Sequence, residues 1–321
     1  MDAILEVRNL KKDYIVPKGV LHAVDQVSFT LERGHTLGVV GESGCGKSTL
    51  GRMLVGLTDI TSGEVIYKNQ PIAKVSKAER RELRKEMQMI FQDPMSSLDP
   101  RFCTAELIAE PLQIFRVYRT RQELNARVRE LMEMVGLSEE MMYAYPHELD
   151  GGRRQRIGIA RALALSPELI VCDEPVSALD VSIQAQVLNL LRQLQRDKGL
   201  TYLFITHDLS VVRHISDDIL VMYMGHMVEK AASKELFIRP LHPYTKGLLS
   251  AIPIPSVRNR HQRIIMKSEI SSPINLKPGC RFASRCPFAS ELCTQKDPTP
   301  QEILPGHMVA CHYAREINKI T

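Results

Sequence analysis

This sequence predicts an α/β fold built around a parallel sheet, on three observations. Short apolar runs alternate with helical patterns in its second half, as in strand–helix–strand units. A glycine-rich turn near residue 41 follows an apolar run and precedes a helical pattern. Two N-terminal segments alternate apolar and polar residues, as half-buried antiparallel strands do. The 321 residues allow one large α/β domain with an appendage, or two domains.

Each element follows from a local pattern. Strands are expected at 5–14 and 27–34, and the apolar run 35–43 leads through the glycine-rich turn into a helix at 48–57. The charged middle of the chain predicts helices at 76–90 and 120–136. The parallel units are then predicted from a strand at 169–172, a helix at 181–197, a strand at 202–206, and a hairpin at 219–231 that turns at Gly225-His226.

The composition and the hydrophobic periodicity of the chain change at Pro240. Prolines become frequent and the periodicity weakens, so we expect a domain at 1–239 and a separate extension at 240–321. A tail of this kind is expected to bury little apolar core of its own. No internal repeat is visible in the sequence.

Composition narrows the classes of partner. The net charge of +5 fits anionic small molecules but is too mild to favour nucleic acid. Tryptophan is absent and aromatic residues make up 5%, which leaves little material for stacking bases. The N-terminus has no pattern of a secretory signal, and no apolar run approaches the length of a membrane span. We therefore expect a reducing compartment for the seven cysteines.

The glycine-rich turn matches the phosphate-loop pattern G-x-x-x-x-G-K-[ST]. Glycines at such positions let backbone N–H groups curl around phosphates, and the N-terminus of the next helix favours the anion. Lys47 would place a positive charge on the β- and γ-phosphates, and Ser48 would offer a hydroxyl to Mg²⁺. The predicted nucleotide-binding residues of the loop are Gly41, Ser43, Gly44, Cys45, Gly46, Lys47, Ser48 and Thr49.

Two acidic residues follow the apolar strand at 169–172. An acid at the end of a strand can hold Mg²⁺, and a second acid beside it can polarise an attacking water. Such a pair alone is more often an acidic turn that starts a helix. Downstream of a phosphate loop, Asp173 becomes the candidate metal acid and Glu174 the candidate general base.

Seven features in order resemble the ATPase subunit of an ATP-binding cassette (ABC) transporter. They are Tyr14, the phosphate loop 41–49, Gln92, the stretch 149–153, the acidic turn 172–175, the segment 177–180 and His207. Individually Tyr14, Gln92 and His207 could be ordinary strand or turn residues; their order carries the resemblance. It implies a phosphate-loop NTPase core with a RecA-like parallel sheet, an N-terminal antiparallel β subdomain and a helical subdomain at about 94–165.

The resemblance also implies roles for individual residues. Tyr14 would stack on adenine, and Gln92 would join Mg²⁺ and the attacking water to the transporter contact. His207 would hydrogen-bond the γ-phosphate, so that Glu174, His207 and Gln92 form the expected catalytic set. Asp180 would line the subunit interface.

The signature loop departs from the family pattern. That loop usually reads Leu-Ser-Gly-Gly-Gln and faces the ATP of the other subunit, whereas this chain has Leu149, Asp150, Gly151, Gly152 and Arg153. A carboxylate at position 150 would be repelled by the γ-phosphate. We therefore expect a heterodimer with one hydrolytic and one weakened site; the alternative is a tolerated variant with both sites active.

Two further stretches narrow the transported solute. Residues 91–101 and 241–253, followed by a cysteine-bearing tail, resemble the oligopeptide, dipeptide and nickel branch of importers. This resemblance implies a second homologous ATPase subunit, two transmembrane permease subunits and an extracytoplasmic solute-binding protein. The chain would lie peripherally at the cytoplasmic face of the cell membrane and import peptides. Nickel or metal chelates, sugars, and a soluble role outside transport are the alternatives.

Four of the seven cysteines lie in the extension. Cys280, Cys286, Cys293 and Cys311 are separated by gaps of five, six and seventeen residues. These gaps are wide and uneven for structural zinc, whereas loop-borne thiolates can hold an iron–sulfur cluster. The branch resemblance implies a [4Fe–4S] cluster; zinc and unligated thiols remain alternatives. His307 and His312 could substitute as ligands, although flanking polar residues are the simpler interpretation.

Overall fold

The computed structural model describes residues 2–252, 264, 266 and 274–320. The fold divides into two compact units. We call residues 33–35 and 74–205 the helical unit, and residues 2–32, 36–73 and 206–321 the phosphate-loop unit. Each unit is described by itself. Part of the predicted extension at 240–321 lies outside the described residues.

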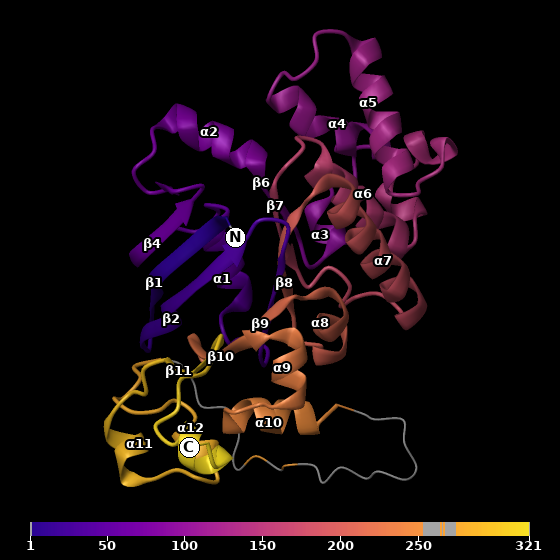
Figure 1. Ribbon diagram of the computed structural model, residues 1–321. Helices are drawn as coiled ribbons and strands as arrows, with labels where there is room; N and C mark the ends of the chain where they lie inside the picture. The colour runs from indigo at the N-terminus through magenta and orange to yellow at the C-terminus, as the bar shows by residue number, and fades with distance from the viewer. Residues whose placement is uncertain (1, 253–263, 265, 267–273, 321) are drawn as a thin grey trace. The chain divides into compact units, whose positions relative to one another are not determined.

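The helical unit contains three parallel strands in the order β6-β7-β8. Its helices α4, α5 and α6 pack on one another (Figure 1). Its elements in chain order are α2 (Lys77–Glu86), β6 (Met87–Ile90), α3 (Pro94–Ser97), α4 (Thr104–Ile114), α5 (Arg121–Met134), the 3₁₀ turns Glu139–Tyr143 and Pro146–Glu148, α6 (Gly151–Leu163), β7 (Leu169–Asp173), α7 (Val181–Lys198) and β8 (Thr201–Thr206).

Local sequence explains where these helices begin. Ser76 starts α2 and Thr120 starts α5, each accepting a hydrogen bond from the backbone N–H three residues on. In both cases the residue at that position is a glutamate, and its carboxylate accepts a hydrogen bond from the backbone N–H of the cap residue. Such capping boxes satisfy two otherwise unpaired N–H groups. Long α7 ends at Gly199, whose φ of 66° suits glycine.

The phosphate-loop unit contains an antiparallel sheet in the order β2-β1-β4-β5 and a second run of strands in the order β11-β12-β10-β9-β3. In the second run β3 and β9 are parallel. The elements are β1 (Ala3–Val16), β2 (Gly19–Glu32), β3 (Thr36–Val40), α1 (Lys47–Leu54), β4 (Ser62–Tyr67), β5 (Gln70–Pro71), α8 (Leu209–Ile215), β9 (Asp218–Tyr223), β10 (His226–Ala232), α9 (Ser233–Ile238), α10 (Pro243–Ser250), the 3₁₀ turn Ala283–Arg285, α11 (Glu291–Gln295), β11 (Gln301–Leu304), β12 (His307–Val309) and α12 (Ala314–Asn318).

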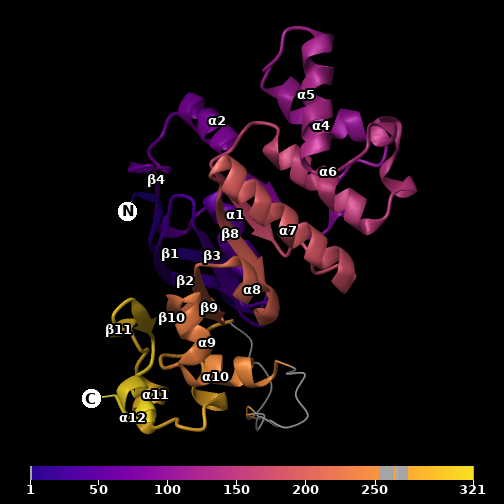
Figure 2. The ribbon, with the colours of Figure 1, turned by 45° about the vertical axis from the view of Figure 1, so that its right-hand side comes forward.

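The extension contributes to the core of this unit. Strand β12 pairs with β10, and Figures 1 and 2 both show β11 near β10, with α11 and α12 beside each other. Tyr244 and Phe282 are fully buried in one cluster with strand residues such as Val221 and Tyr223. The expectation that the tail buries little core was therefore wrong. Some of its apolar residues pack on β9 and β10, and Leu241, Ile303 and Val309 belong to a second buried cluster within the extension.

The α/β prediction with parallel strands and an N-terminal antiparallel sheet is confirmed. Two local predictions were wrong. Residues 87–90 form strand β6, because the charged helical pattern ends at Glu86 and a short apolar run pairs with β7. The β9–β10 turn is Met224-Gly225, and His226 is already the first residue of β10. Among the described residues, no helix combines the length and apolarity needed to cross a membrane.

Candidate functional site

Two glycines of the phosphate loop are required by close backbone contacts. Gly41 and Gly46 have φ values of 155° and 104°. A Cβ on Gly41 would lie 2.2 Å from the carbonyl oxygen of Met222, and one on Gly46 would lie 2.0 Å from that of Ala23. Both distances are far inside van der Waals contact, so these positions accept glycine alone. The loop is therefore held tightly between β2 and β9.

Lys47 closes the loop on itself. Its ammonium group donates to the carbonyl oxygens of Gly41 at 2.8 Å and Glu42 at 3.0 Å, and the side chain is buried. Helix α1 begins at Lys47 with no side-chain cap, and the N-terminus of a helix favours an anion. Burial raises the pKa of the Cys45 thiol, so that Cys45 stays neutral in this loop.

Glu42 is a residue of the phosphate loop that the sequence motif did not single out, because the motif allows any residue there. Arg285 donates two hydrogen bonds to its carboxylate, at 2.8 and 3.0 Å. The backbone N–H of Glu42 donates a hydrogen bond to the hydroxyl of Tyr244 at 3.0 Å. No sequence signal could have found this role, because both partners are more than two hundred residues away in the chain.

The acidic turn after β7 brings two predicted catalytic residues together. Glu174 has a φ of 47°, a left-handed conformation that is rare for glutamate. Its N–H donates to Ile205 at 2.9 Å, and its carboxylate accepts from the side-chain amide of Gln92 at 3.1 Å. Asp173, the last residue of β7, is buried. The helical unit thus holds the general-base candidate in a fixed, strained turn.

Two other predicted residues lie in the phosphate-loop unit. His207 is exposed and directly follows β8, and Asp208 after it caps α8 by accepting from the N–H of Ser210 at 2.7 Å. Tyr14 lies near the end of β1 with 36% of its surface exposed. The ammonium group of Lys12 lies 4.8 Å from the centre of the Tyr14 ring. The roles of both residues toward a nucleotide stay predictions.

The unusual signature stretch has a clear local explanation. Asp150 is the N-cap of α6, and its carboxylate accepts from the N–H of Arg153 at 2.8 Å. The Arg153 guanidinium lies 3.4 Å from the same carboxylate. A Cβ on Gly152 of α6 would lie 2.6 Å from the side chain of Ile183 on α7, so the close approach of the two helices favours glycine at position 152. Aspartate is among the strongest N-cap residues, as serine is, so the exchange keeps this helix start.

The four cysteines of the extension are neighbours. Burial raises the pKa of the Cys280 thiol to about 12, and Cys293, Cys311 and Cys286 act in the same direction. The N–H of Phe288 donates to the sulfur of Cys286 at 3.4 Å. Within the described ranges, no three His, Cys, Asp or Glu side chains form a group that could hold a metal ion. His307 instead pairs with Glu229 at 2.7 Å, and His312 contacts the carbonyl of Lys296 at 2.8 Å.

Two family models match the chain. One, described as ABC transporter, matches residues 24–177, and the other, described as the oligopeptide/dipeptide transporter C-terminal region, matches residues 228–293. The oligopeptide transport ATP-binding protein AppF of Bacillus subtilis is 50% identical over 321 residues, which cover 97% of each chain. The oligopeptide transport ATP-binding protein OppF of Salmonella typhimurium is 50% identical and covers 96% of this chain and 95% of its own.

Solved structures show the same similarity for the catalytic core. The ATP-binding cassette MJ0796, in a dimeric post-hydrolysis state bound to ADP and phosphate, matches with a TM-score of 0.65 and 29% identity. This match covers 71% of this chain and 98% of that chain. The protein cbiO1 of Clostridium perfringens, part of an ABC transporter complex, matches with a TM-score of 0.65 and 28% identity, over 74% of this chain and 92% of that chain.

Proposed function

The chain belongs to the family of ATP-binding subunits of ABC transporters, and we propose that it hydrolyses ATP to power the import of oligopeptides or dipeptides. The observation that carries the substrate class is the identity of about one half, along nearly the full length, to oligopeptide transport ATP-binding proteins. The complete phosphate loop, with its buried Lys47, supports the ATPase activity.

The roles proposed for the site follow the chemistry of its side chains. Lys47 binds the β- and γ-phosphates, and Glu174 polarises the attacking water as general base. Bound Mg²⁺ would neutralise phosphate charge, with Ser48, Gln92 and Asp173 as its candidate ligands. Tyr14 stacks on the adenine, His207 hydrogen-bonds the γ-phosphate, and Asp180 lines the interface with the other ATPase subunit. The contact of Gln92 with Glu174 supports placing both in one catalytic set.

The proposed assembly contains this chain, a second homologous ATPase subunit, two permease subunits and an extracytoplasmic binding protein, without nucleic acid. The chain would bind peripherally at the cytoplasmic face of the membrane. Residues 1–239 would form the nucleotide-binding domain and 240–321 the extension. The helical subdomain at about 94–165, which contains α3 to α6, would transmit closure of the ATPase pair to the permease subunits.

Asp150 supports a further proposal about the ATPase pair. Its carboxylate is committed to the start of α6 and to Arg153, in the loop that would face the ATP of the other subunit. We propose that the site formed with this loop hydrolyses ATP weakly, and that the site formed by Lys47 and the partner's signature loop is the hydrolytic one. The alternative is that Arg153 compensates the charge and both sites turn over.

The four cysteines support a proposed [4Fe–4S] cluster. The support is chemical alone: four thiols in one short segment are a donor set that iron–sulfur clusters accept, whereas the described side chains form no metal-binding group in this structure. A bound cluster would crosslink this segment, with Cys280, Cys286, Cys293 and Cys311 as ligands. Iron and acid-labile sulfide assays on anaerobically purified protein test this. We expect about four of each per chain; zinc alone, or no metal, would contradict it.

Calorimetry on the extracytoplasmic binding protein of the same transporter tests the substrate class. We expect heat of binding with short peptides and none with a nickel chelate or a sugar. Binding of the nickel chelate in place of peptides would contradict the proposed substrate and leave the ATPase activity of this chain intact. Co-purification in detergent with permease subunits tests the transport role itself, because a soluble ATPase would elute without them.

A further inference from the structure

Glu42 is held at three points, and two of the holding groups come from the extension. Its backbone N–H is bound by Tyr244 of α10, and its carboxylate is bound by both terminal nitrogens of Arg285. Its carbonyl oxygen accepts from Lys47 at 3.0 Å and from the N–H of Cys45 at 3.2 Å. The position of Lys47 in the loop is therefore linked to two side chains of the extension.

Arg285 packs against a buried cluster of aromatic rings. Its guanidinium carbon lies 5.7 Å from the ring centre of Tyr223 and 6.0 Å from that of Phe282. Tyr223, Tyr244 and Phe282 pack against one another with ring centres 4.7 to 5.5 Å apart, and all three are buried. The Arg285 side chain is 7% exposed. A guanidinium held in this way loses little side-chain entropy when it binds a carboxylate.

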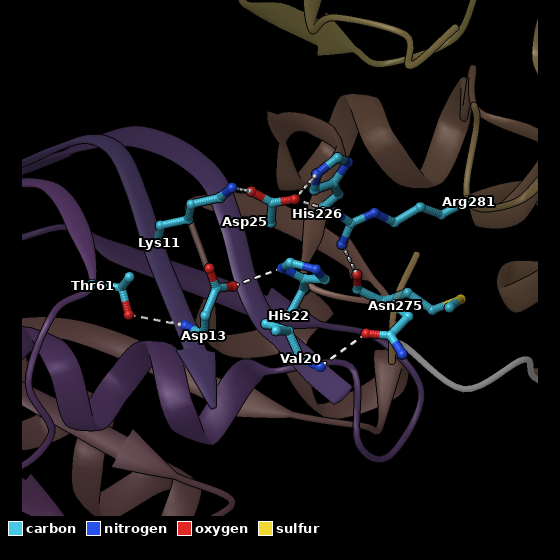
Figure 3. Close-up of polar contacts among 10 residues, drawn as sticks. Lys11, Asp13, Val20, His22, Asp25, Thr61, His226, Asn275 and Arg281 are labelled. Atoms are coloured by element: carbon cyan, nitrogen blue, oxygen red, sulfur yellow. Dashed lines mark hydrogen bonds and ion pairs between the residues drawn. The ribbon is translucent and has the colours of Figure 1, made fainter. Parts of the chain in front are cut away.

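The segment that carries Arg285 is anchored a second time, four residues earlier. Figure 3 shows Arg281 reaching the carboxylate of Asp25 on β2. Arg281 also donates a hydrogen bond to the backbone carbonyl of Met224. Lys11 and His226 also contact Asp25, at 3.0 and 3.2 Å. The next residue after Met224, Gly225, donates its N–H to the carbonyl of Cys45 in the phosphate loop at 2.9 Å. The extension and the phosphate loop thus share a continuous set of contacts.

The charge of Glu42 makes these contacts relevant to nucleotide binding. A phosphate loop receives a polyanion, and a bare carboxylate inside that loop would repel it. Arg285 offsets this charge and fixes the position of the carboxylate, whose side chain is 22% exposed. We propose that Arg285 is a positioning residue for ATP: it neutralises Glu42 and, with Tyr244, holds the phosphate loop in the shape that receives the triphosphate. The proposal rests on the ATPase function proposed above.

A double-mutant cycle on the full-length chain tests this. The variants are Arg285→Ala, Glu42→Gln and the double variant, and the readout is the Kd of the fluorescent nucleotide mant-ATP with Mg²⁺. We expect Arg285→Ala to weaken binding about tenfold, and Glu42→Gln in the same chain to restore it to within about threefold. Recovery follows because the double variant no longer exposes an uncompensated carboxylate. Arg315→Ala, on the exposed face of α12, is the matched control and should bind like the wild type.

Other outcomes separate this proposal from its alternatives. Unchanged affinity in folded Arg285→Ala, or losses that simply add in the double variant, would overturn it. A wild-type chain that fails to bind mant-ATP would instead refute the ATPase function. Thermal unfolding without nucleotide is measured first. If Arg285→Ala does not fold, Arg285→Lys replaces it in the same cycle, with an expected loss of about threefold that Glu42→Gln removes; no loss, or no recovery, again overturns the proposal.

Discussion

Asp150 has an observed role in local structure, and its charge carries a proposed role in chemistry. Its carboxylate begins α6 by accepting from the N–H of Arg153, and the positive end of the helix favours its charge. A serine would make the same cap without the charge. The structural role therefore explains why the helix tolerates aspartate, and the effect of its charge on the nucleotide of a second ATPase subunit is the part that we propose.

Two substitutions at Asp150 separate the cap from the charge. Asp150→Ala should lower the free energy of unfolding by about 1 kcal/mol, whereas Asp150→Ser should leave it within about 0.5 kcal/mol, as measured by urea denaturation. In the assembled transporter, Asp150→Ser should raise ATP turnover or shorten nucleotide retention at the partner's site. If neither property changes in Asp150→Ser, the interpretation that both sites are active is the better one.

The site was predictable from sequence where the chemistry is local and hidden where it comes from distant segments. The spacing of Gly41, Gly46 and Lys47 is sufficient to predict a phosphate loop, because the motif encodes close backbone contacts. The contacts of Glu42 could not be predicted, since Tyr244 and Arg285 lie about two hundred residues further along the chain. No local pattern reports a pairing over that separation.

At the scale of elements, helix α10 depends on an uncharged histidine. The ring of His242 accepts from the N–H of Tyr244 at 3.1 Å and caps the helix. Burial lowers the pKa of His242 from 6.5 to about 4. Below pH 6.5 His242 is protonated in the unfolded chain, whereas in the folded protein it stays neutral down to about pH 4. Stability is therefore lost as the pH falls through this window.

The loss from His242 alone should reach roughly 3 kcal/mol at pH 4. Free energies of unfolding measured between pH 7 and pH 4 check this, with His242→Asn as the comparison. Asparagine can also cap a helix but does not titrate, so this variant should start less stable and lose less on acidification. Parallel curves for the two proteins would show that His242 contributes nothing to the pH dependence.

Short apolar segments were the elements that sequence could not settle. Met87-Gln-Met-Ile90 follows a charged helix without a glycine or proline, and a run of four apolar-rich residues fits a helix or a buried strand equally well. In the structure these four residues pair with β7 and therefore form a strand. The extension was misjudged for a related reason: Phe282 and Tyr244 form no periodic pattern, and their burial comes from strands elsewhere in the chain.

At the scale of the whole molecule, the extension is part of the core of the phosphate-loop unit. Phe282→Ala should therefore lower the free energy of unfolding by about 3–5 kcal/mol, because it leaves a cavity among Tyr223, Tyr244 and their neighbours. Phe288→Ala, on the same segment but 51% exposed, is the matched control and should cost under about 1 kcal/mol. Equal, small losses in both would mean that the extension packs loosely.

ATP-driven peptide uptake by the assembled transporter tests the central claim most directly. Membrane vesicles containing the transporter are loaded with ATP and Mg²⁺ on the side of this chain, and uptake of a labelled oligopeptide is compared between the wild type and Glu174→Gln. We expect Glu174→Gln to retain ATP binding and to lose at least about a hundredfold in hydrolysis and uptake together. Glu140→Gln, at an exposed position, should behave like the wild type. Undiminished uptake by Glu174→Gln would contradict the account.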